Sequence, residues 1–174
     1  MLDPCCITRH PPAPLVEVIG SDRAWAGRLA DAVGALAGGA TVLALSPDRR
    51  VVRFAGKASW REAGGEAAIA EAGGRSVEVG HAWQPFAIEG AGARALLERG
   101  IELDLDPRHF AVGHAAATLC ARVPVLLFAD GAEAYTLFVA TSYADWLAGW
   151  LETAAKAVRS SAPSQSTECL EHGS

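Results

Sequence analysis

Apolar positions in the second half of the chain, residues 81–159, change their period from one element to the next. Between residues 83 and 89 they nearly alternate, which is typical of a half-buried β-strand, and Gly90 ends the run. Residues 91–99 return to helical spacing. We therefore expect a strand that passes directly into a helix, followed by a short acidic segment, three apolar runs and a long final helix.

The final helix has the clearest pattern in the chain. Ser142 is a suitable N-cap, and Asp145 lies in the first turn, where the helix dipole favours an anion. We expect the helix to run to Arg159 and to pack through a broad apolar stripe. This stripe consists of Tyr143, Trp146, Leu147, Trp150, Leu151, Ala154 and Val158.

The first half predicts a strand, an amphipathic helix and a hairpin, in that order. Ser21 is a suitable N-cap for this helix, and Gly38 and Gly39 end it. Residues 46–49 suit a type I turn between the two strands of the hairpin. This β-α-β-β order is half of a ferredoxin-like unit. The apolar face of the helix is Trp25, Leu29, Val33 and Leu36, and the strands are placed at residues 15–19, 41–45 and 50–54.

The region between the two halves is less regular. Residues 57–75 predict a short helix with few apolar anchors, and residues 76–79 predict a strand that leads towards the second half. This continuity suggests that the first strands share a sheet with the second half, which repeats a similar order of strand, helix, three strands and helix. The fold class is therefore α+β, with ferredoxin-like β-α-β-β units, an antiparallel or mixed sheet and helices packed on it.

The length of 174 residues suits one domain, which we place at residues 15–159. Residues 1–14 contain Pro11, Pro12 and Pro14, and we expect an extended lead-in that joins no β-ladder, because proline lacks a backbone N–H. Residues 160–174 are polar and serine-rich, and we expect a disordered tail.

Composition argues against several classes of function. The net charge of −5 is unsegregated, so we expect no binding of nucleic acid or of an anionic membrane. We see neither a secretory signal nor an apolar run of about 18 residues, and we expect a cytoplasmic protein. The four cysteines, two of them adjacent, indicate no disulfide framework. Apolar residues make up 51 % and charged residues 20 %, and we expect part of this apolar excess to surface as a partner contact.

Gly90 and Gly92 fit the pattern G-x-G-x-x-A after a strand, a setting in which backbone N–H groups cradle a pyrophosphate. A dinucleotide-binding fold continues with a second parallel strand and an acidic residue about 20 positions later. Here the next strand-like segment is too short and comes too early. We interpret the pattern as a strand-to-helix turn and assign no cofactor-binding residue.

Glu102, Asp104 and Asp106 alternate, so in an extended segment they project to one side, as ligands of a hard cation do. Leu103 and Leu105 on the opposite side explain the alternation by themselves. A calcium loop also needs further ligands and a glycine at set spacing. We therefore assign no metal ligand.

His109, His114 and Cys120 form the one close set that resembles a nucleophile with its base. Cys120 lies in an apolar run, as buried thiols do, and no acidic side chain has an evident place beside either histidine. We assign no catalytic residue.

Four tryptophans suit either a flat ligand site or a role as packing anchors, and packing is the more frequent role of such residues. They are Trp60, Trp83, Trp146 and Trp150.

Several short sequences in the second half together resemble a known family. They are the Gly90–Leu97 junction, Asp104–Pro107 followed by Phe110–Gly113, the strand Val123–Phe128, and Ser142–Leu147 at the start of the last helix. These pieces are similar to the gamma subunit of heterotetrameric sarcosine oxidase, most strongly over residues 81–159. The resemblance implies a fold like the folate-binding domain of aminomethyltransferases. In those relatives a catalytic aspartate is expected just before the strand that begins at Val123, where this chain has Ala121 and Arg122.

The resemblance implies a non-catalytic assembly subunit of a flavin-dependent amine oxidase or dehydrogenase that demethylates sarcosine or a related secondary amino acid. It implies larger flavin-bearing alpha and beta subunits as partners, and it places FAD, FMN, NAD and tetrahydrofolate in those partners rather than in this chain. Two alternatives remain open, a stand-alone folate-dependent one-carbon transferase and a small-ligand binding module. Ordered catalytic carboxylates favour the transferase, and a deep apolar pocket with convergent polar groups favours the module.

Overall fold

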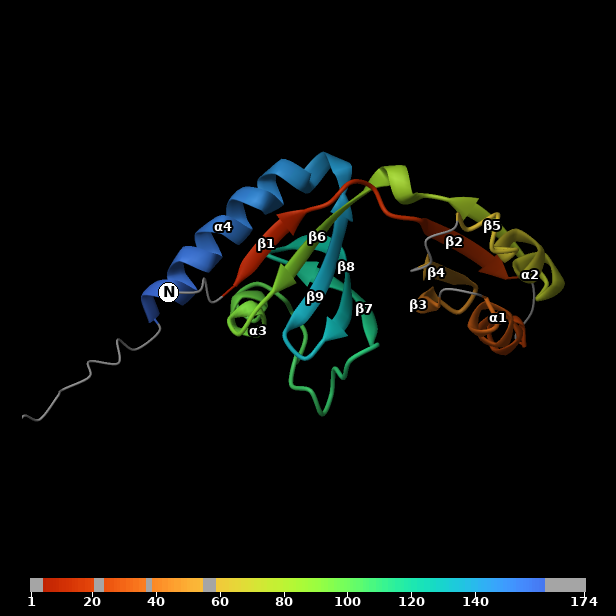
Figure 1. Ribbon diagram of the computed structural model, residues 1–174, viewed down its shortest axis with the longest axis horizontal. Coiled ribbons are helices and arrows are strands. Elements are labelled where there is room, and N and C mark those ends of the chain that lie inside the picture. Colours follow the sequence, from red (N-terminus) through yellow and green to blue (C-terminus); the bar gives the residue numbers. More distant parts are fainter. Residues whose placement is uncertain (1–4, 21–23, 37–38, 55–58, 162–174) are drawn as a thin grey trace, which may run out of the picture.

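A computed structural model describes residues 5–20, 24–36, 39–54 and 59–161 of the chain. Two antiparallel β-sheets lie beside each other in the middle of the molecule, and helices cover the outer face of each sheet (Figure 1). The architecture therefore has four layers, helix, sheet, sheet and helix, and it agrees with the predicted α+β class.

The first sheet is a complete ferredoxin-like unit. Its elements are β2 (Leu15–Gly20), α1 (Trp25–Gly34), β3 (Ala40–Ser46), β4 (Arg49–Phe54), α2 (Gly65–Glu71) and β5 (Gly74–Glu78). The strand order is β3-β4-β2-β5, and each neighbouring pair is antiparallel. The predicted β-α-β-β half is thus present and is completed by α2 and β5.

Helix boundaries in this unit differ from the predicted ones. α1 buries Trp25, Leu29 and Val33 as expected but ends at Gly34. α2 has seven residues and is the short helix predicted within residues 57–75. The proposed N-cap Ser21 and the glycine at position 38 lie outside the described residues.

The second sheet contains the remaining strands. Its elements are β1 (Cys6–Arg9), β6 (Trp83–Glu89), α3 (Ala93–Leu97), β7 (Ala115–Cys120), β8 (Val123–Gly131), β9 (Ala134–Ala140) and α4 (Ala144–Ser161), with 3₁₀ turns η1 (Gly80–Ala82) and η2 (Thr141–Tyr143). The order is β1-β6-β9-β8-β7. The predicted strand at 83–89 and the following order of helix, three strands and helix are confirmed, whereas α3 is shorter than the predicted 91–99.

The prediction that residues 1–14 join no ladder is wrong for β1. β1 pairs antiparallel with β6, from Cys6 opposite Glu89 to Arg9 opposite Phe86. The prolines of residues 1–14 lie at position 4, before the strand, and at positions 11, 12 and 14, after it, so the residues of β1 keep the N–H groups that a ladder needs. β1 is also the one early strand that shares a sheet with the second half, because β2 to β5 form a sheet of their own.

Each sheet contributes to two hydrophobic cores, because successive side chains of a strand point to opposite faces. Val52 packs with α1 and α2, whereas the adjacent Val51 faces the second sheet. In the same way Leu127 packs with α3 and α4, whereas Phe128 faces the first sheet. The core between the sheets consists of Leu15, Leu43, Val51, Leu126, Phe128 and Phe138.

The last helix confirms its predicted stripe only in part. Leu147 and Leu151 are fully buried, but Tyr143 and Trp146 are 48 % and 51 % exposed. α4 begins at residue 144, two residues after the proposed cap, so Tyr143 belongs to η2. Trp146 lies about 100° around the helix axis from Leu147, which carries it past the edge of the face that meets the sheet.

Two chain segments cross between the sheets side by side, one joining β1 to β2 and one joining β5 to β6 (Figure 1). The Val79 N–H donates to Leu15 O at 2.8 Å, and the Gln84 side-chain amide donates to His10 O at 2.5 Å. Gly80 fits tightly here, because a Cβ at this position would lie 2.3 Å from Ala13 O. A side chain at position 80 would therefore push the two crossing segments apart.

We expect Gly80→Ala to lower the free energy of unfolding by about 1–3 kcal/mol, the usual cost of forcing extra atoms into a packed site. Urea unfolding followed by tryptophan fluorescence measures this difference. Gly149→Ala in α4 is the matched control, since a Cβ there meets no atom within 4 Å. The control is expected to be neutral or to stabilise by up to about 1 kcal/mol, because alanine favours helix over glycine. Equal effects of the two substitutions would contradict the close crossing.

Candidate functional site

A cleft of about 620 Å³ opens between the two sheets beside the proline-rich crossing segment. Its charged and hydroxyl groups come from strands of both sheets. Arg53 lies on β4 of the first sheet, whereas Glu89, Asp130 and Thr136 lie on β6, β8 and β9 of the second. The remaining walls are formed by His10, Pro11, Pro12, Ala13, Pro85, Ala87 and Phe138.

Arg53 connects the two sheets inside this cleft. Its Nη1 lies 2.6 Å from Asp130 Oδ1, and its Nη2 donates to Thr136 Oγ1 at 3.2 Å. The Thr136 hydroxyl in turn donates to Asp130 Oδ2 at 2.5 Å. We call these three residues the inter-sheet clamp.

The strand pattern explains how the inter-sheet clamp forms. Arg53 is two residues from Val51 and so points to the same face, towards the second sheet. The register between β8 and β9 shifts between Ala129 and Gly131, which leaves Asp130 at the irregularity. The guanidinium lies over the rings of Phe128 and Phe138, 5.1 and 5.7 Å from their centroids. Such cation–π contacts are worth about 0.5–2 kcal/mol.

We expect Asp130→Asn to lower the free energy of unfolding by about 1.5–3 kcal/mol, because a charged hydrogen bond in a partly buried site is lost. The Arg53 and Asp130 side chains are 23 % and 38 % exposed. Glu66→Gln is the matched control, because Glu66 and its partner Arg61 are 60 % and 66 % exposed and surface ion pairs contribute about 0–1 kcal/mol. Chemical denaturation of both variants tests the difference, and an effect of Asp130→Asn no larger than the control would argue against the inter-sheet clamp.

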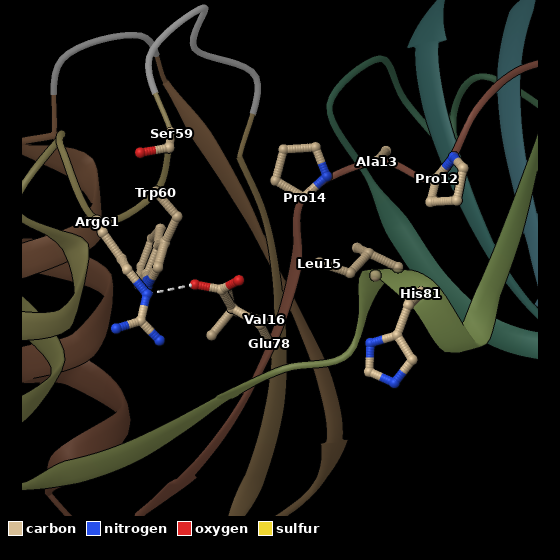
Figure 2. A pocket seen from close by; sticks show the side chains of 11 residues that line it. Pro12, Ala13, Pro14, Leu15, Val16, Ser59, Trp60, Arg61, Glu78 and His81 are labelled. Carbon is tan, nitrogen blue, oxygen red and sulfur yellow. Dashed lines mark hydrogen bonds and ion pairs between the residues drawn. The ribbon is translucent and has the colours of Figure 1, made fainter.

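A second cavity of about 440 Å³ lies on the other side of the crossing segment. Figure 2 shows Arg61 and Glu78 directed towards each other, Pro12 to Leu15 beside them, and His81 further along the same hollow. Arg61 Nε lies 2.9 Å from Glu78 Oε1, and Arg61 Nη1 lies 3.1 Å from Glu66 Oε2. These three side chains are all more than half exposed, so the charges are paired with one another and solvated.

The Gly90–Gly92 pattern forms a tight turn between β6 and α3. Gly90 has φ of +109°, a conformation that suits glycine, and its N–H donates to Glu133 O at 2.9 Å. The Ala93 N–H donates to Gly90 O at 2.8 Å, so the N–H groups of Gly90 and Ala93 are both bonded within the protein. α3 has only five residues, which gives little helix dipole for a phosphate.

The acidic segment is organised by its own side chains. Asp104 Oδ1 accepts from the Asp106 N–H, and Asp106 Oδ1 accepts from the Arg108 N–H, both at 2.9 Å. The Arg108 guanidinium beside Asp106 lowers the pKa of that carboxyl to about 2. Leu105 is fully buried, as the alternation suggested. Within the described part of the chain, no group of three or more His, Cys, Asp and Glu side chains is placed to hold a metal ion.

One contact in this segment was missed by sequence reasoning. His109 Nδ1 lies 2.5 Å from Asp104 Oδ2, so an acidic side chain does stand beside one histidine. The hydrogen bond with Asp104 raises the pKa of His109 above its usual 6.5. The five-residue spacing was the available signal, but only the turn at Asp106 brings the two side chains together.

We expect the imidazole of His109 to titrate above pH 6.5 by NMR, and Asp104→Asn to move that pKa back towards 6.5. Because the folded-state pKa is raised, the ion pair contributes fully below the unfolded pKa and is lost as pH rises through the folded value. Asp145→Asn serves as the control because Asp145 pairs with Arg9 on β1 instead. An unchanged His109 pKa in Asp104→Asn would show that the contact is absent in solution.

The structure does not assemble His109, His114 and Cys120 into one site. Cys120 is fully buried in the core beneath α3 and α4, and burial raises the pKa of its thiol to about 12. Both histidines are exposed, and His114 packs edge-on against Phe110 with ring centroids 6.0 Å apart. A neutral buried thiol is a poor nucleophile at pH 7.

The four candidate tryptophans lie in different surroundings. Trp60 packs edge-on against Phe54 in the core of the first sheet, and Trp83 borders the core between the sheets. Trp150 packs against the core beneath α4, whereas Trp146 is half exposed. They therefore do not line a common ligand site.

Among the residues that the structure describes, large apolar side chains are exposed in three places. Tyr143 and Trp146 lie at the start of α4, and Ile19 and Val77 lie on neighbouring strands β2 and β5. Val112 lies in the loop before β7 and is 60 % exposed. Within the described residues, no helix is both long enough and apolar enough to span a lipid bilayer.

The fold is similar to that of a chain in a solved heterotetrameric enzyme. It aligns with a chain of the heterotetrameric sarcosine oxidase from Corynebacterium sp. U-96 in complex with pyrrole 2-carboxylate, with a TM-score of 0.76 and 21 % identity over 94 % of this chain and 89 % of that chain. Residues 23–157 match the sarcosine oxidase, gamma subunit family, and the chain belongs to this family.

Two relatives carry the same family name. The sarcosine oxidase subunit gamma of Corynebacterium sp. strain U-96 is 28 % identical over 123 residues, which is 69 % of this chain and 60 % of that protein. The subunit gamma of Corynebacterium sp. strain P-1 is 28 % identical over 142 residues, 80 % of this chain and 66 % of that protein. The match therefore spans less than two thirds of each relative.

Proposed function

We propose that this chain is a non-catalytic assembly subunit of a heteromeric flavin-dependent enzyme that demethylates sarcosine or a related secondary amino acid. Its partners are larger flavin-bearing alpha and beta subunits in the cytoplasm, and FAD, FMN, NAD and tetrahydrofolate are bound by those partners. Membership of the gamma subunit family supports this proposal, as does the heterotetrameric state of the structural relative.

The observation that carries the proposal is the exposed aromatic pair Tyr143 and Trp146. Tyrosine and tryptophan are enriched among the residues that dominate binding energy in protein interfaces. Tyr143 ends η2, and Trp146 lies three residues further on in the first turn of α4. An exposed aromatic pair suits a subunit whose surface is covered in a complex.

The groups with catalytic potential also support a non-catalytic role. The thiol of Cys120 is buried and neutral, and His109 is held by Asp104 at an exposed loop. The turn before β8, where the aminomethyltransferase pattern expects an aspartate, is formed by Ala121 and Arg122 with φ of 47° and 70°. These residues supply no carboxylate for folate chemistry, which disfavours the stand-alone transferase.

We expect Trp146→Ser to weaken co-purification of the larger subunits when the chains are co-expressed, by roughly 30-fold or more in dissociation constant, since interface tryptophans often contribute about 2 kcal/mol or more. The stability of the chain itself is expected to change little, because the side chain is half exposed. Glu152→Gln on the charged flank of α4 is the matched control. Undiminished assembly of Trp146→Ser would remove the main support for the interface.

We also expect Cys120→Ala, His109→Ala and His114→Ala to leave turnover of the assembled enzyme within a few-fold of the parent. Removal of a true catalytic group usually costs at least about 100-fold. The measurement is amine-dependent turnover with equal subunit and flavin content in each preparation. A loss of 100-fold in any of the three, with assembly intact, would establish a catalytic role for this chain.

A further inference from the structure

The last helix carries a second row of side chains besides the row that packs into the core. The core row is spaced alternately by three and four residues, and it consists of Ala144, Leu147, Leu151, Ala154 and Val158. The first five residues of the second row each stand one position before a core residue, so this row lies about 100° away around the helix axis. We call it the outer seam, and it consists of Tyr143, Trp146, Trp150, Thr153, Ala157 and Ser160.

The outer seam carries no charge along the whole helix. The charged residues of α4 all lie on the opposite flank, and they are Asp145, Glu152, Lys156 and Arg159. Two hydroxyl groups of the seam are bonded to the helix itself, because Thr153 Oγ1 donates to Gly149 O at 2.8 Å and Ser160 Oγ donates to Ala157 O at 2.9 Å. Neither hydroxyl is therefore left as a free donor for water.

Most of the outer seam is open to solvent on the outer side of the second sheet (Figure 1). Tyr143 and Trp146 are 48 % and 51 % exposed, and Thr153 and Ser160 are exposed as well. Trp150 is half-buried, because its ring lies against Gly100, where a Cβ would be 2.5 Å from the ring. The ring of Trp150 is thus held in place before a partner binds, which lowers the entropy cost of binding.

The spacing and length of the outer seam indicate a helix as its partner. Side chains that alternate by three and four residues pack on a second helix at a crossing angle of about 20°, so that the two helices stay in contact over many turns. With 18 residues, α4 offers such a contact over about 27 Å. The absence of charge requires an apolar face on the partner helix, since a charge buried in the seam would have no counter-charge.

We propose that the outer seam packs against an amphipathic helix of a larger subunit, an inference that rests on the assembly role proposed above. The seam is bulky in its aromatic first half and small in its second half, which consists of Thr153, Ala157 and Ser160. Close packing requires the opposite order on the partner. The partner helix therefore has small residues against the aromatic half and large aliphatic residues against the small half.

Photo-cross-linking in the co-expressed complex tests which segment covers the outer seam. The cross-linking amino acid p-benzoylphenylalanine replaces Trp146, Thr153 or Ser160, and Glu152 on the charged flank is the control position. We expect the three seam positions to cross-link to sites about seven residues apart within one continuous segment of a larger subunit, and position 152 to give no such cross-link. Cross-links to a second copy of this chain, to separate segments, or equally from position 152 would overturn the proposal.

Charge substitutions test the small half of the seam separately from Trp146. We expect Thr153→Arg and Ser160→Glu each to weaken binding of the larger subunits at least about tenfold, because the new charge is buried without a partner. Glu152→Arg on the charged flank is the matched control and is expected to change nothing. All three positions are exposed, so the unfolding temperature of the free chain is expected to stay the same.

The outcomes separate the two proposals. If Trp146→Ser weakens assembly but Thr153→Arg and Ser160→Glu do not, the helix partner is overturned and the assembly role stands. If the parent chain does not co-purify with larger subunits at all, both proposals are rejected.

Discussion

The packing of one sheet on the other is the contact on which the rest of the structure depends. Each sheet has a helix-covered face, and each would expose its second face to water without the other. Leu43 and Val51 meet Leu126, Phe128 and Phe138 in this contact, and all five are at most 4 % exposed. Burying one such side chain contributes about 1.5–3 kcal/mol, which is a large fraction of the stability of a small protein. The inter-sheet clamp lies at the edge of this core and fixes the orientation of one sheet on the other.

The local elements were predictable because their signals are local. The near-alternation at residues 83–89 and the four-residue spacing of Trp25, Leu29 and Val33 specify one strand and one helix face without reference to the rest of the chain. The assignment of strands to sheets was not predictable in this way. β1 has four residues and only Ile7 packed on a core, so its place beside β6 comes from a partner about 80 residues away.

In the candidate site, too, the local features were predictable from the sequence and the long-range contacts were not. The buried state of Cys120 followed from the apolar run around it, and the anchoring role of Leu105 followed from alternation. Arg53 and Asp130, by contrast, are 77 residues apart and have nothing in their neighbouring sequence that marks them as partners. The spacing of Trp146 fitted the apolar stripe of the last helix. This stripe is broader than the contact between the helix and the sheet, so its edge lies in solvent. Only the packed structure shows that Trp146 is at this edge.

The path of the chain has a consequence during synthesis. β1 leaves the ribosome first, but the strand beside it, β6, is made only after the whole ferredoxin-like sheet has been translated. At about 5–20 residues per second, β1 waits for its neighbour for roughly 4–16 s, the period in which all of β2 to β5 is made. The four-residue strand β1 therefore joins its sheet late. Until β6 is made, the nascent chain carries β1 with its backbone N–H and C=O groups unpaired.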